Sequence, residues 1–288
     1  MGRRGIATSV AAAIAAILIA SCGGSPNGPG PLPPPPPPPP VNSPPVIEGI
    51  TIGAERAEVT DDVAVAATVR DTETAVNELQ YAWSADGGTF SGEGASVKWR
   101  PPSDRATPAE YTMRLTVTET YGVPDGTGVR PKNVVTATSA ASVRVHNSSR
   151  EIGELALGFL REFASSAIPA DVAVRDFSDS CAGKASERSD ISDNRKNYEV
   201  LASSLNLVNV SIASSRLAGS ARVACGFTSR VKACTADHPG CAIGSTEKVA
   251  GECVLRTVYE QRRWWLCESK FENGVQLPSM PGFFDAHR

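Results

Sequence analysis

The chain has 288 residues, which is enough for two domains of ordinary size. Its formal net charge is −3 at pH 7 and it has no long basic run, so nucleic acid is not expected as a partner. Of the 7 cysteines, Cys22 stands alone and the others lie between Cys181 and Cys267, which predicts three disulfides in an exported segment.

The first 21 residues have the pattern of a secretory signal. Arg3 and Arg4 precede an apolar run over 11–20, and small residues follow. This run is about half of the roughly 20 residues that a membrane-spanning helix needs, so we expect a signal peptide over 1–21. The residues around the arginine pair fit a twin-arginine signal poorly, which favours the general secretory route.

The stretch from Ile19 to Cys22 contains an aliphatic residue, two small residues and a cysteine. It resembles the lipobox of bacterial lipoproteins. The resemblance implies that Cys22 receives a diacylglycerol, that the signal is cut before it, and that the chain is anchored in a lipid bilayer without spanning it. Gly23 stands where an Asp would retain such a protein at the inner membrane, which implies an outer-membrane location. The alternative is an ordinary signal with a chance cysteine.

Residues 22–45 are mostly Gly, Ser, Asn and Pro, with an unbroken proline run from Pro33 to Pro40. Such a run cannot form a core and stiffens into a polyproline II rod. We therefore interpret this stretch as a linker that holds the folded part away from the membrane. A ligand for a proline-binding groove is the alternative.

Residues 46–147 alternate apolar and polar side chains in short runs, for example over 63–69, 79–83 and 111–117. Turn residues such as those at 86–88 separate the runs. Many short alternating strands over about 100 residues predict an all-β Ig-like sandwich. The stretch contains no cysteine, so the inter-sheet disulfide of antibody domains is absent.

Three segments of this region, 79–88, 97–99 and 111–118, resemble a PKD-like domain of the immunoglobulin-like class. In that family an aromatic-rich strand carries a core tryptophan, here Trp83, a Gly-rich turn follows, and a late strand reads Tyr-x-hydrophobic-x-Leu-x-Val. The stretch 121–133 has the composition of a longer loop. Such domains act as spacers or adhesive modules, and the resemblance implies the same role here.

Residues 148–274 begin with a helical pattern. Apolar residues recur at helical spacing from Ile152 to Phe163, which predicts an amphipathic helix ending at Ile168-Pro169. Asp171 is expected to cap a short second helix. The stretch 190–205 is expected to be a third helix, or a helix that passes into a strand.

Four strands are expected next, over 208–213, 221–231, 249–259 and 264–271, and the tail 275–288 follows them. Helices followed by long antiparallel strands predict an α+β domain with a curved antiparallel sheet. The hairpin over 258–266 resembles the closing hairpin of NTF2-like, cone-shaped α+β domains. The sequence thus indicates a multidomain chain, with an all-β sandwich followed by an α+β domain.

The cysteine positions suggest a register for the disulfides. In an antiparallel hairpin the numbers of opposed residues have a constant sum. Two cysteine pairs have nearly equal sums, so one hairpin with a bulge would bring both together. These pairs are Cys225–Cys253 and Cys234–Cys241, which leaves Cys181–Cys267. This is one of 15 possible connectivities. Because Cys-x-x-Cys spacing is missing, no metal site is expected.

No catalytic motif is evident. The histidines, His146, His238 and His287, do not lie beside a Ser or Cys nucleophile in a recognisable pattern, so a hydrolase triad has no support. No glycine-rich phosphate loop occurs, and we expect no cofactor.

Two carboxylate-rich turns flank Cys181, and the candidate catalytic residues in them are Asp176, Asp179 and Asp190. They could form a cation site or supply a general base facing a pocket, as in isomerases of the NTF2-like class. Helix capping and a salt-bridged turn are the alternative, and the spacing matches no known calcium loop.

The adjacent Trp264 and Trp265 should face opposite sides of a strand. One is expected to fill the core. The other is a weak candidate for ligand binding, for example to a carbohydrate, or it packs beneath the first helix.

These features favour a non-enzymatic envelope lipoprotein that binds or contacts a partner from the end of a proline-rich spacer. The expected partners are the lipid bilayer, through Cys22, and an envelope protein, a glycan or a small ligand. The alternative is a small-molecule-binding or isomerase-like enzyme that uses a carboxylate of the α+β domain.

Overall fold

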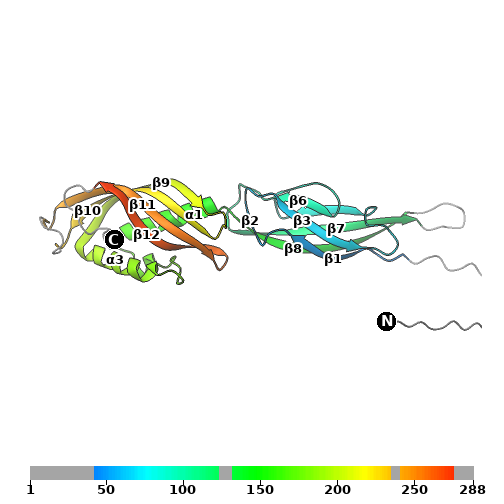
Figure 1. Ribbon diagram of the computed structural model, residues 1–288, viewed down its shortest axis with the longest axis horizontal. Coiled ribbons are helices and arrows are strands. Elements are labelled where there is room, and N and C mark those ends of the chain that lie inside the picture. The colour runs from blue at the N-terminus through cyan, green and yellow to red at the C-terminus, as the bar shows by residue number, and fades with distance from the viewer. Residues whose placement is uncertain (1–41, 123–131, 235–240, 276–288) are drawn as a thin grey trace, which may run out of the picture. The chain divides into compact units, whose positions relative to one another are not determined.

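The computed structural model describes residues 42–122, 132–234 and 241–275. The predicted signal peptide, Cys22, most of the linker, His238, His287 and nearly all of the predicted tail lie outside these ranges. The described residues from Asn42 onward belong to one compact unit. They are mostly β, with three four-stranded sheets and three helices (Figure 1).

Two of the sheets lie in the first part of the chain. The first sheet is β1 (Val46–Ile52), β3 (Val63–Arg70), β6 (Ser96–Arg100) and β5 (Thr89–Ser91), in that order. The second is β2 (Arg56–Glu58), β8 (Lys132–His146), β7 (Ala109–Gly122) and β4 (Gln80–Ala85). We call β1–β8 the two-sheet part.

The strands of the two sheets alternate inward and outward side chains, and the inward ones form two apolar clusters, a larger one that includes Trp99 and a smaller one of Leu79, Leu115 and Val117. On β7, for example, Tyr111, Met113 and Leu115 are buried, whereas Arg114 is exposed. The buried tryptophan is Trp99 on β6, whose Nε1 donates to the Gly87 carbonyl at 3.0 Å. Trp83 on β4 is half-buried, packs against both apolar clusters of this part, and donates to the Gly94 carbonyl at 3.0 Å.

The strands β7 and β8 extend further than predicted. Tyr121 pairs with Asn133 and Gly122 pairs with Lys132, so both ends of the expected loop are strand. The composition of 121–133 hid this because it contains little period-two alternation. The rest of that stretch lies outside the described residues.

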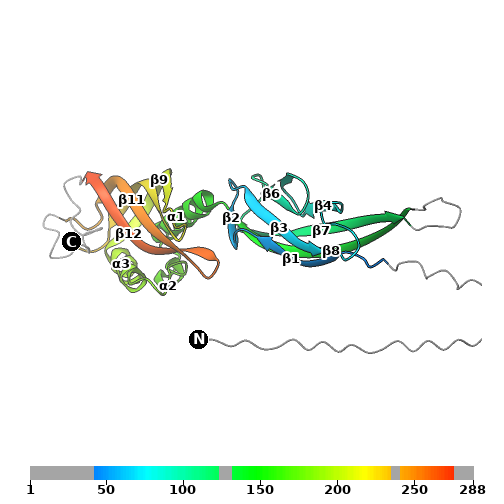
Figure 2. The ribbon, with the colours of Figure 1, turned by 45° about the vertical axis from the view of Figure 1, so that its right-hand side comes forward.

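The third sheet and the helices form what we call the third-sheet part, α1–β12. Its sheet is β12 (Arg263–Val275), β11 (Thr246–Glu260), β10 (Ala218–Val231) and β9 (Tyr198–Ile212), all antiparallel neighbours. The helices are α1 (Ser148–Ala164), α2 (Ala170–Ala173) and α3 (Gly183–Asn197). The sheet curls into a half-barrel with α1 on its concave side (Figure 2).

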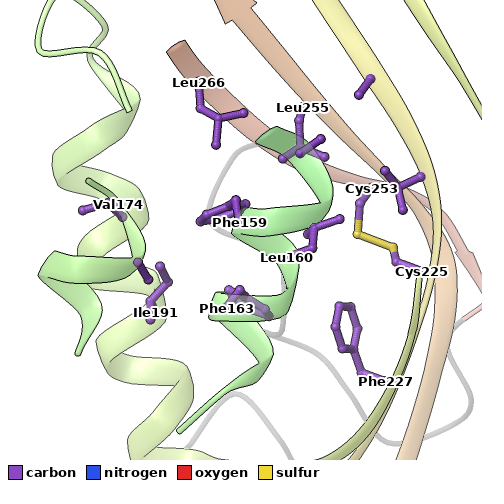
Figure 3. Packing of buried hydrophobic residues seen from close by; sticks show 14 of the residues in the cluster. Phe159, Leu160, Phe163, Val174, Ile191, Cys225, Phe227, Cys253, Leu255 and Leu266 are labelled. Carbon is purple, nitrogen blue, oxygen red and sulfur yellow. A yellow bond between two sulfur atoms is a disulfide. The ribbon is translucent and has the colours of Figure 1, made fainter. Parts of the chain in front are cut away.

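The apolar stripe of α1 fills this concave side. Phe159, Leu160 and Phe163 are buried among sheet residues that include Phe227 and Leu255 (Figure 3). The Asn147 side chain caps the helix by accepting from the Arg150 N–H at 3.2 Å. The amphipathic helix was predicted correctly, and its end was not.

The helix boundaries after α1 differ from the prediction. α1 ends at Ala164, and Pro169 is the N-cap of α2, so the proline begins a helix rather than ending one. Asp171 lies in the first turn of α2 but makes no capping hydrogen bond. The third helix covers Gly183–Asn197, and the chain continues from Tyr198 as β9.

Three disulfides confirm the predicted disulfide bonding, and they join Cys181 to Cys267, Cys225 to Cys253, and Cys234 to Cys241. The register of β10 and β11 is not the expected one. Cys225 lies opposite Gly251, and Cys253 lies opposite Val223, so this bridge joins diagonal neighbours and the ladder needs no bulge.

Disulfides persist in oxidising compartments, so these bridges indicate an extracytoplasmic protein. Within the part of the chain that the structure describes, none of the helices combines the length and apolar character that crossing a bilayer requires.

Candidate functional site

A cluster of buried and half-buried polar side chains surrounds the amino end of α1. We call it the joint network, and its members are Arg56, Glu58, His146, Ser148, Glu151, Tyr259 and Trp264. Arg56 and Glu58 come from β2 and His146 from the end of β8, whereas Tyr259 and Trp264 come from β11 and β12. The network therefore joins the two-sheet part to the third-sheet part.

Ser148, the first residue of α1, is fully buried at the centre of the network. Its backbone N–H donates to Glu58 Oε2 at 3.0 Å, and its Oγ donates to Glu58 Oε1 at 2.6 Å. The same Oγ accepts from Trp264 Nε1 at 2.9 Å. A carboxylate at a helix amino end is favourable because free N–H groups and the helix dipole face it.

The charge of Glu58 is balanced by Arg56, whose Nη2 lies 2.7 Å from Oε1. Nη1 of Arg56 donates to the Arg216 carbonyl at 2.6 Å, and its guanidinium lies 3.8 Å from the centre of the Tyr259 ring. The side chain of Arg56 is only 13% exposed, and its guanidinium contacts a carboxylate, a carbonyl and an aromatic face in place of water.

His146 has no exposed surface and bridges two partners. Its Nδ1 lies 2.7 Å from Glu151 Oε2, and its Nε2 lies 3.0 Å from the Tyr259 hydroxyl. Burial alone would raise the pKa of the Glu151 carboxyl, but hydrogen bonds from His146 and Thr107 outweigh it and hold that pKa below its usual value. Burial raises the pKa of Tyr259.

Ion pairs lie around this centre, between turns of the third sheet and the two-sheet part. Arg216, after β9, makes a bidentate pair with Asp61 at 2.5 and 2.8 Å. This contact is the main reason that the pKa of Asp61 lies below its ordinary value. Arg262, in the β11–β12 turn, pairs with Glu110. Arg216 and Arg262 both have positive φ angles, 58° and 64°, as tight turns require.

The predicted carboxylates lie elsewhere. Asp176 accepts from Arg263 Nη2 at 2.6 Å, and Asp179 pairs with Lys184 at 2.7 Å with its side chain 92% exposed. Asp190 is half-buried on α3. Their surroundings are those of a salt-bridged turn and a helix surface.

A hollow of about 570 Å³ lies beside α3, and its lining includes Asp179, Lys184 and Arg188. Asp176 and Asp190 do not line it, so the structure does not gather the three candidates into one site. The concave side of the sheet, where a pocket was considered, is filled by apolar side chains such as Phe159 and Leu266 (Figure 3).

Trp264 and Trp265 face opposite sides of β12, as expected. Trp264 is 4% exposed and belongs to the joint network. Trp265 is half-buried, donates to the Glu260 carbonyl at 3.1 Å, and lies 3.8 Å beneath the guanidinium of Arg263. A ring that is already covered by a guanidinium has less face available for a sugar.

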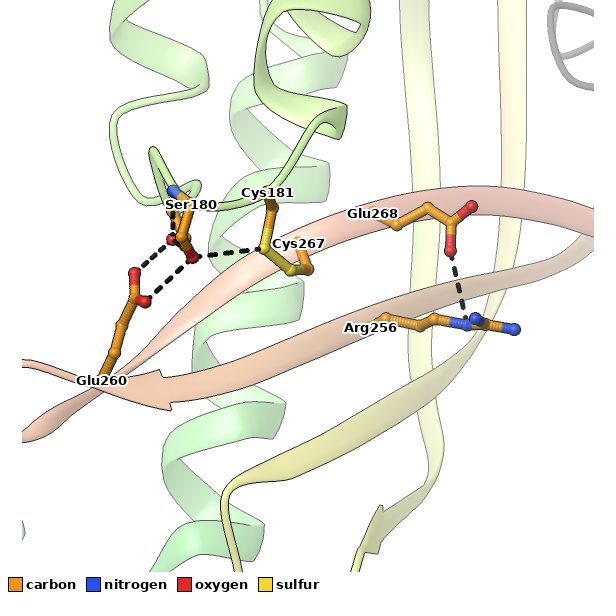
Figure 4. Close-up of a disulfide and its surroundings, with 7 residues drawn as sticks. Ser180, Cys181, Arg256, Glu260, Cys267 and Glu268 are labelled. Carbon is orange, nitrogen blue, oxygen red and sulfur yellow. Dashed lines mark hydrogen bonds and ion pairs between the residues drawn. A yellow bond between two sulfur atoms is a disulfide. The ribbon is translucent and has the colours of Figure 1, made fainter.

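A second polar contact fixes the loop after α2 to the β11–β12 hairpin (Figure 4). Ser178 and Ser180 both donate to the Glu260 carboxylate, and the adjacent Cys181 is bonded to Cys267. The covalent and polar ties act at the same place, so the helices are held to the third sheet.

Sequence reasoning placed His146 at a domain junction but found no role for it, and it missed Arg56, Glu58 and Ser148. A three-residue strand of sequence Arg-Ala-Glu gives no signal that its polar side chains will be buried. Their partners lie about a hundred residues away along the chain, for example Ser148 for Glu58, and a single sequence does not indicate such contacts.

The described residues contain no group of three His, Cys, Asp or Glu side chains suited to hold a metal ion. Comparison with known proteins finds no match: no family model, no curated protein and no solved structure corresponds to the chain. The interpretation of the site therefore depends on its geometry alone.

Proposed function

We propose that the chain is a non-enzymatic lipoprotein of the cell envelope. It is anchored through Cys22 and presents the third-sheet part to a binding partner. In this proposal an Ig-like, PKD-like sandwich carries an α+β, NTF2-like domain at the end of the proline-rich linker. The predicted domain limits, with a boundary between 147 and 148, belong to the same proposal.

The observation that carries the proposal is the buried contact of Ser148 with Glu58 and Trp264. Flexible linkers between independent domains are exposed and make few contacts. Here a single residue, Asn147, separates β8 from α1, and both neighbours of that residue are fully buried. Such a joint suits a protein that holds one part at a fixed position relative to the other.

The partners of the proposed protein are the bilayer and an envelope protein, a glycan or a small ligand. The enzyme alternative gains no support from the carboxylates, because Asp176 and Asp179 are ion-paired with Arg263 and Lys184. A surface module needs rigid presentation more than a reactive cavity, which agrees with the filled concave side of the sheet.

Calorimetry on Glu58→Ala tests the joint. The substitution leaves the Ser148 N–H and the Arg56 guanidinium without their carboxylate, at a cost of about 3–5 kcal/mol for a broken buried pair. We expect one unfolding transition for the unaltered chain and two for the variant. Glu48→Ala is the control, because Glu48 makes an exposed ion pair with Arg70. Two unfolding transitions in the unaltered chain would contradict a rigid joint.

Fractionation of cells carrying Cys22→Ser tests the anchor separately. Loss of the acylated residue should move the protein from the membrane fraction to the soluble envelope fraction. Membrane association that survives the substitution would exclude anchoring by lipid and leave the joint unaffected.

A further inference from the structure

The strand β9 is the last of its sheet, in the order β12-β11-β10-β9, and no described strand pairs with its outer edge (Figures 1 and 2). It is 15 residues long, and much of it is exposed. The outer backbone groups of such a strand are a template for another strand, so proteins usually protect long edges.

The two edges of this sheet differ in charge. The opposite edge strand, β12, carries Arg263, Glu268, Lys270 and Glu272, and charged side chains are a common protection against edge pairing. β9 carries one charge in its whole length, Glu199 near its start, and it has no proline. The β9 edge thus lacks the protection that the β12 edge has.

Exposed apolar side chains collect on β9. Leu201 is 44% exposed, Leu207 41% and Val208 56%. Leu201 and Val208 are the extra residues at two irregularities in the pairing with β10. The stretch 202–207 between them is regular, so six consecutive residues present an uninterrupted edge.

Each face of this regular stretch has its own chemistry. Leu205 and Leu207 lie opposite Cys225 and Val223, which are buried, so both leucines face the concave side. Ser204 lies opposite Gly226, and Asn206 lies opposite Ala224, so these two polar residues share the convex face. Ser203, opposite the buried Phe227, shares the concave face with the two leucines. A strand added to this edge would therefore meet two leucines and a serine on one face and neutral hydrogen-bonding groups on the other.

We propose that β9 pairs antiparallel with β9 of a second copy of this chain, about a two-fold axis at Leu205. Opposed residues of an antiparallel pair share a face, so the axis of an isologous pair must pass midway between one residue and the same residue of the second copy. Of the two residues at the middle of the stretch, Leu205 places apolar side chains at the axis: Leu205 meets Leu205 of the second copy, and Leu207 meets Ser203 of the second copy on the same face. On the convex face, Ser204 meets Asn206 of the second copy.

The near absence of charge on β9 favours pairing with a second copy over pairing with a strand of another protein. Two-fold pairing commonly brings like charges together, and like charges directly opposite destabilise a sheet. β9 avoids this because Glu199, its one charge, would lie opposite Ser211. The same neutrality leaves no charge pattern by which the edge could select a different protein.

Sedimentation velocity on the full oxidised chain, with Cys22→Ser to prevent acylation, tests the proposal. We expect a dimer that dissociates on dilution. The double variant Ser204→Lys/Asn206→Lys places a lysine opposite a lysine of the second copy at two positions. The sedimenting species should therefore have the mass of one chain instead of two. Ser204→Lys/Asn206→Glu instead opposes Lys to Glu twice, and it should restore the mass of two chains.

Gln80→Lys/Ser84→Lys is the matched control, because both residues are exposed on β4, an edge strand of the second sheet. It should remain a dimer, and circular dichroism should show all variants folded. A single-chain mass for the unaltered protein up to about 100 µM would overturn the proposal. A double-lysine variant that stays dimeric, or a Lys/Glu variant that stays monomeric, would also overturn it.

Discussion

The two-sheet part and the third-sheet part stabilise their cores in different ways. The two-sheet part encloses its core between two sheets, and its described residues contain no cysteine. The third-sheet part has one curled sheet whose concave side is covered by helices, and it contains three disulfides. In this chain the core between two sheets has no covalent tie. A sheet that is covered by α1, a four-residue helix and the polar helix α3 gains more from such ties.

The largest effect is expected from removing the disulfide that closes the longest loop of the third-sheet part. Cys181–Cys267 closes a loop with a sequence separation of 86, and Cys234–Cys241 one with a separation of 7. The chain-entropy estimate gives about 4.5 kcal/mol for the long loop and about 2.5 kcal/mol for the short one. Denaturant unfolding of Cys181→Ser/Cys267→Ser should therefore show the larger loss of stability.

The matched variant is Cys234→Ser/Cys241→Ser. If both double variants lost the same stability, loop closure would not be the reason for the ties, and the contrast between the two parts would need another cause.

Trp99→Ala tests the disulfide-free core. Trp99 has no exposed surface, and Trp→Ala in a core costs about 3–5 kcal/mol because a cavity replaces the ring. Trp265→Ala is the control, since Trp265 is half-buried on the outer side of β12. We expect the melting temperature to fall much further for Trp99→Ala, and equal losses would show that Trp99 does not organise the core.

A buried carboxyl of α3 gives a smaller, pH-dependent effect. Burial raises the pKa of Glu187 from 4.5 to about 7, the neighbouring Asp190 and Glu268 add to the shift, and a hydrogen bond from Ser269 opposes it. The folded state therefore holds a proton that the unfolded state releases between about pH 4.5 and 7. Stability should decrease as the pH rises through this window, by no more than about 3–4 kcal/mol.

Glu187→Gln keeps the contact with Ser269 and removes the titration, so its free energy of unfolding should lose this pH dependence. Urea unfolding at pH 5, 6, 7 and 8 measures it. Glu154→Gln, on the exposed side of α1, should keep the unaltered pH dependence. A Glu187→Gln variant with the same pH dependence as the unaltered chain would show that another group is responsible.

Local patterns predicted the elements that alternate regularly, and they failed where the pattern is broken. The strands over 63–69 and 111–117 and the stripe of α1 followed directly from period-two and helical spacing. The stretch 190–205 is the helix passing into a strand that was one of the two expectations, but the start of α3 at Gly183 was missed, because the helix buries only Glu187 and Ile191 and so has almost no apolar stripe. β9 was predicted too short because its two bulges interrupt the alternation.

The joint network could not be predicted for a different reason. Its contacts join residues far apart in the sequence, such as His146 and Tyr259, and each is an ordinary polar residue in its local context. The disulfide pairs were accessible because cysteines are few and their partners restricted. The register that suggested them was still wrong, since the bridge between β10 and β11 runs diagonally.

The single residue between β8 and α1 also limits where the protein can be truncated. A cut before Ser148 would separate two sheets from a third, and it would remove the Arg56 guanidinium from the Tyr259 and Trp264 rings. It would also leave the first N–H of α1 without the carboxylate of Glu58. The third-sheet part is therefore unsuited to being moved between proteins as a cassette, and it should be transferred together with β2 and the end of β8.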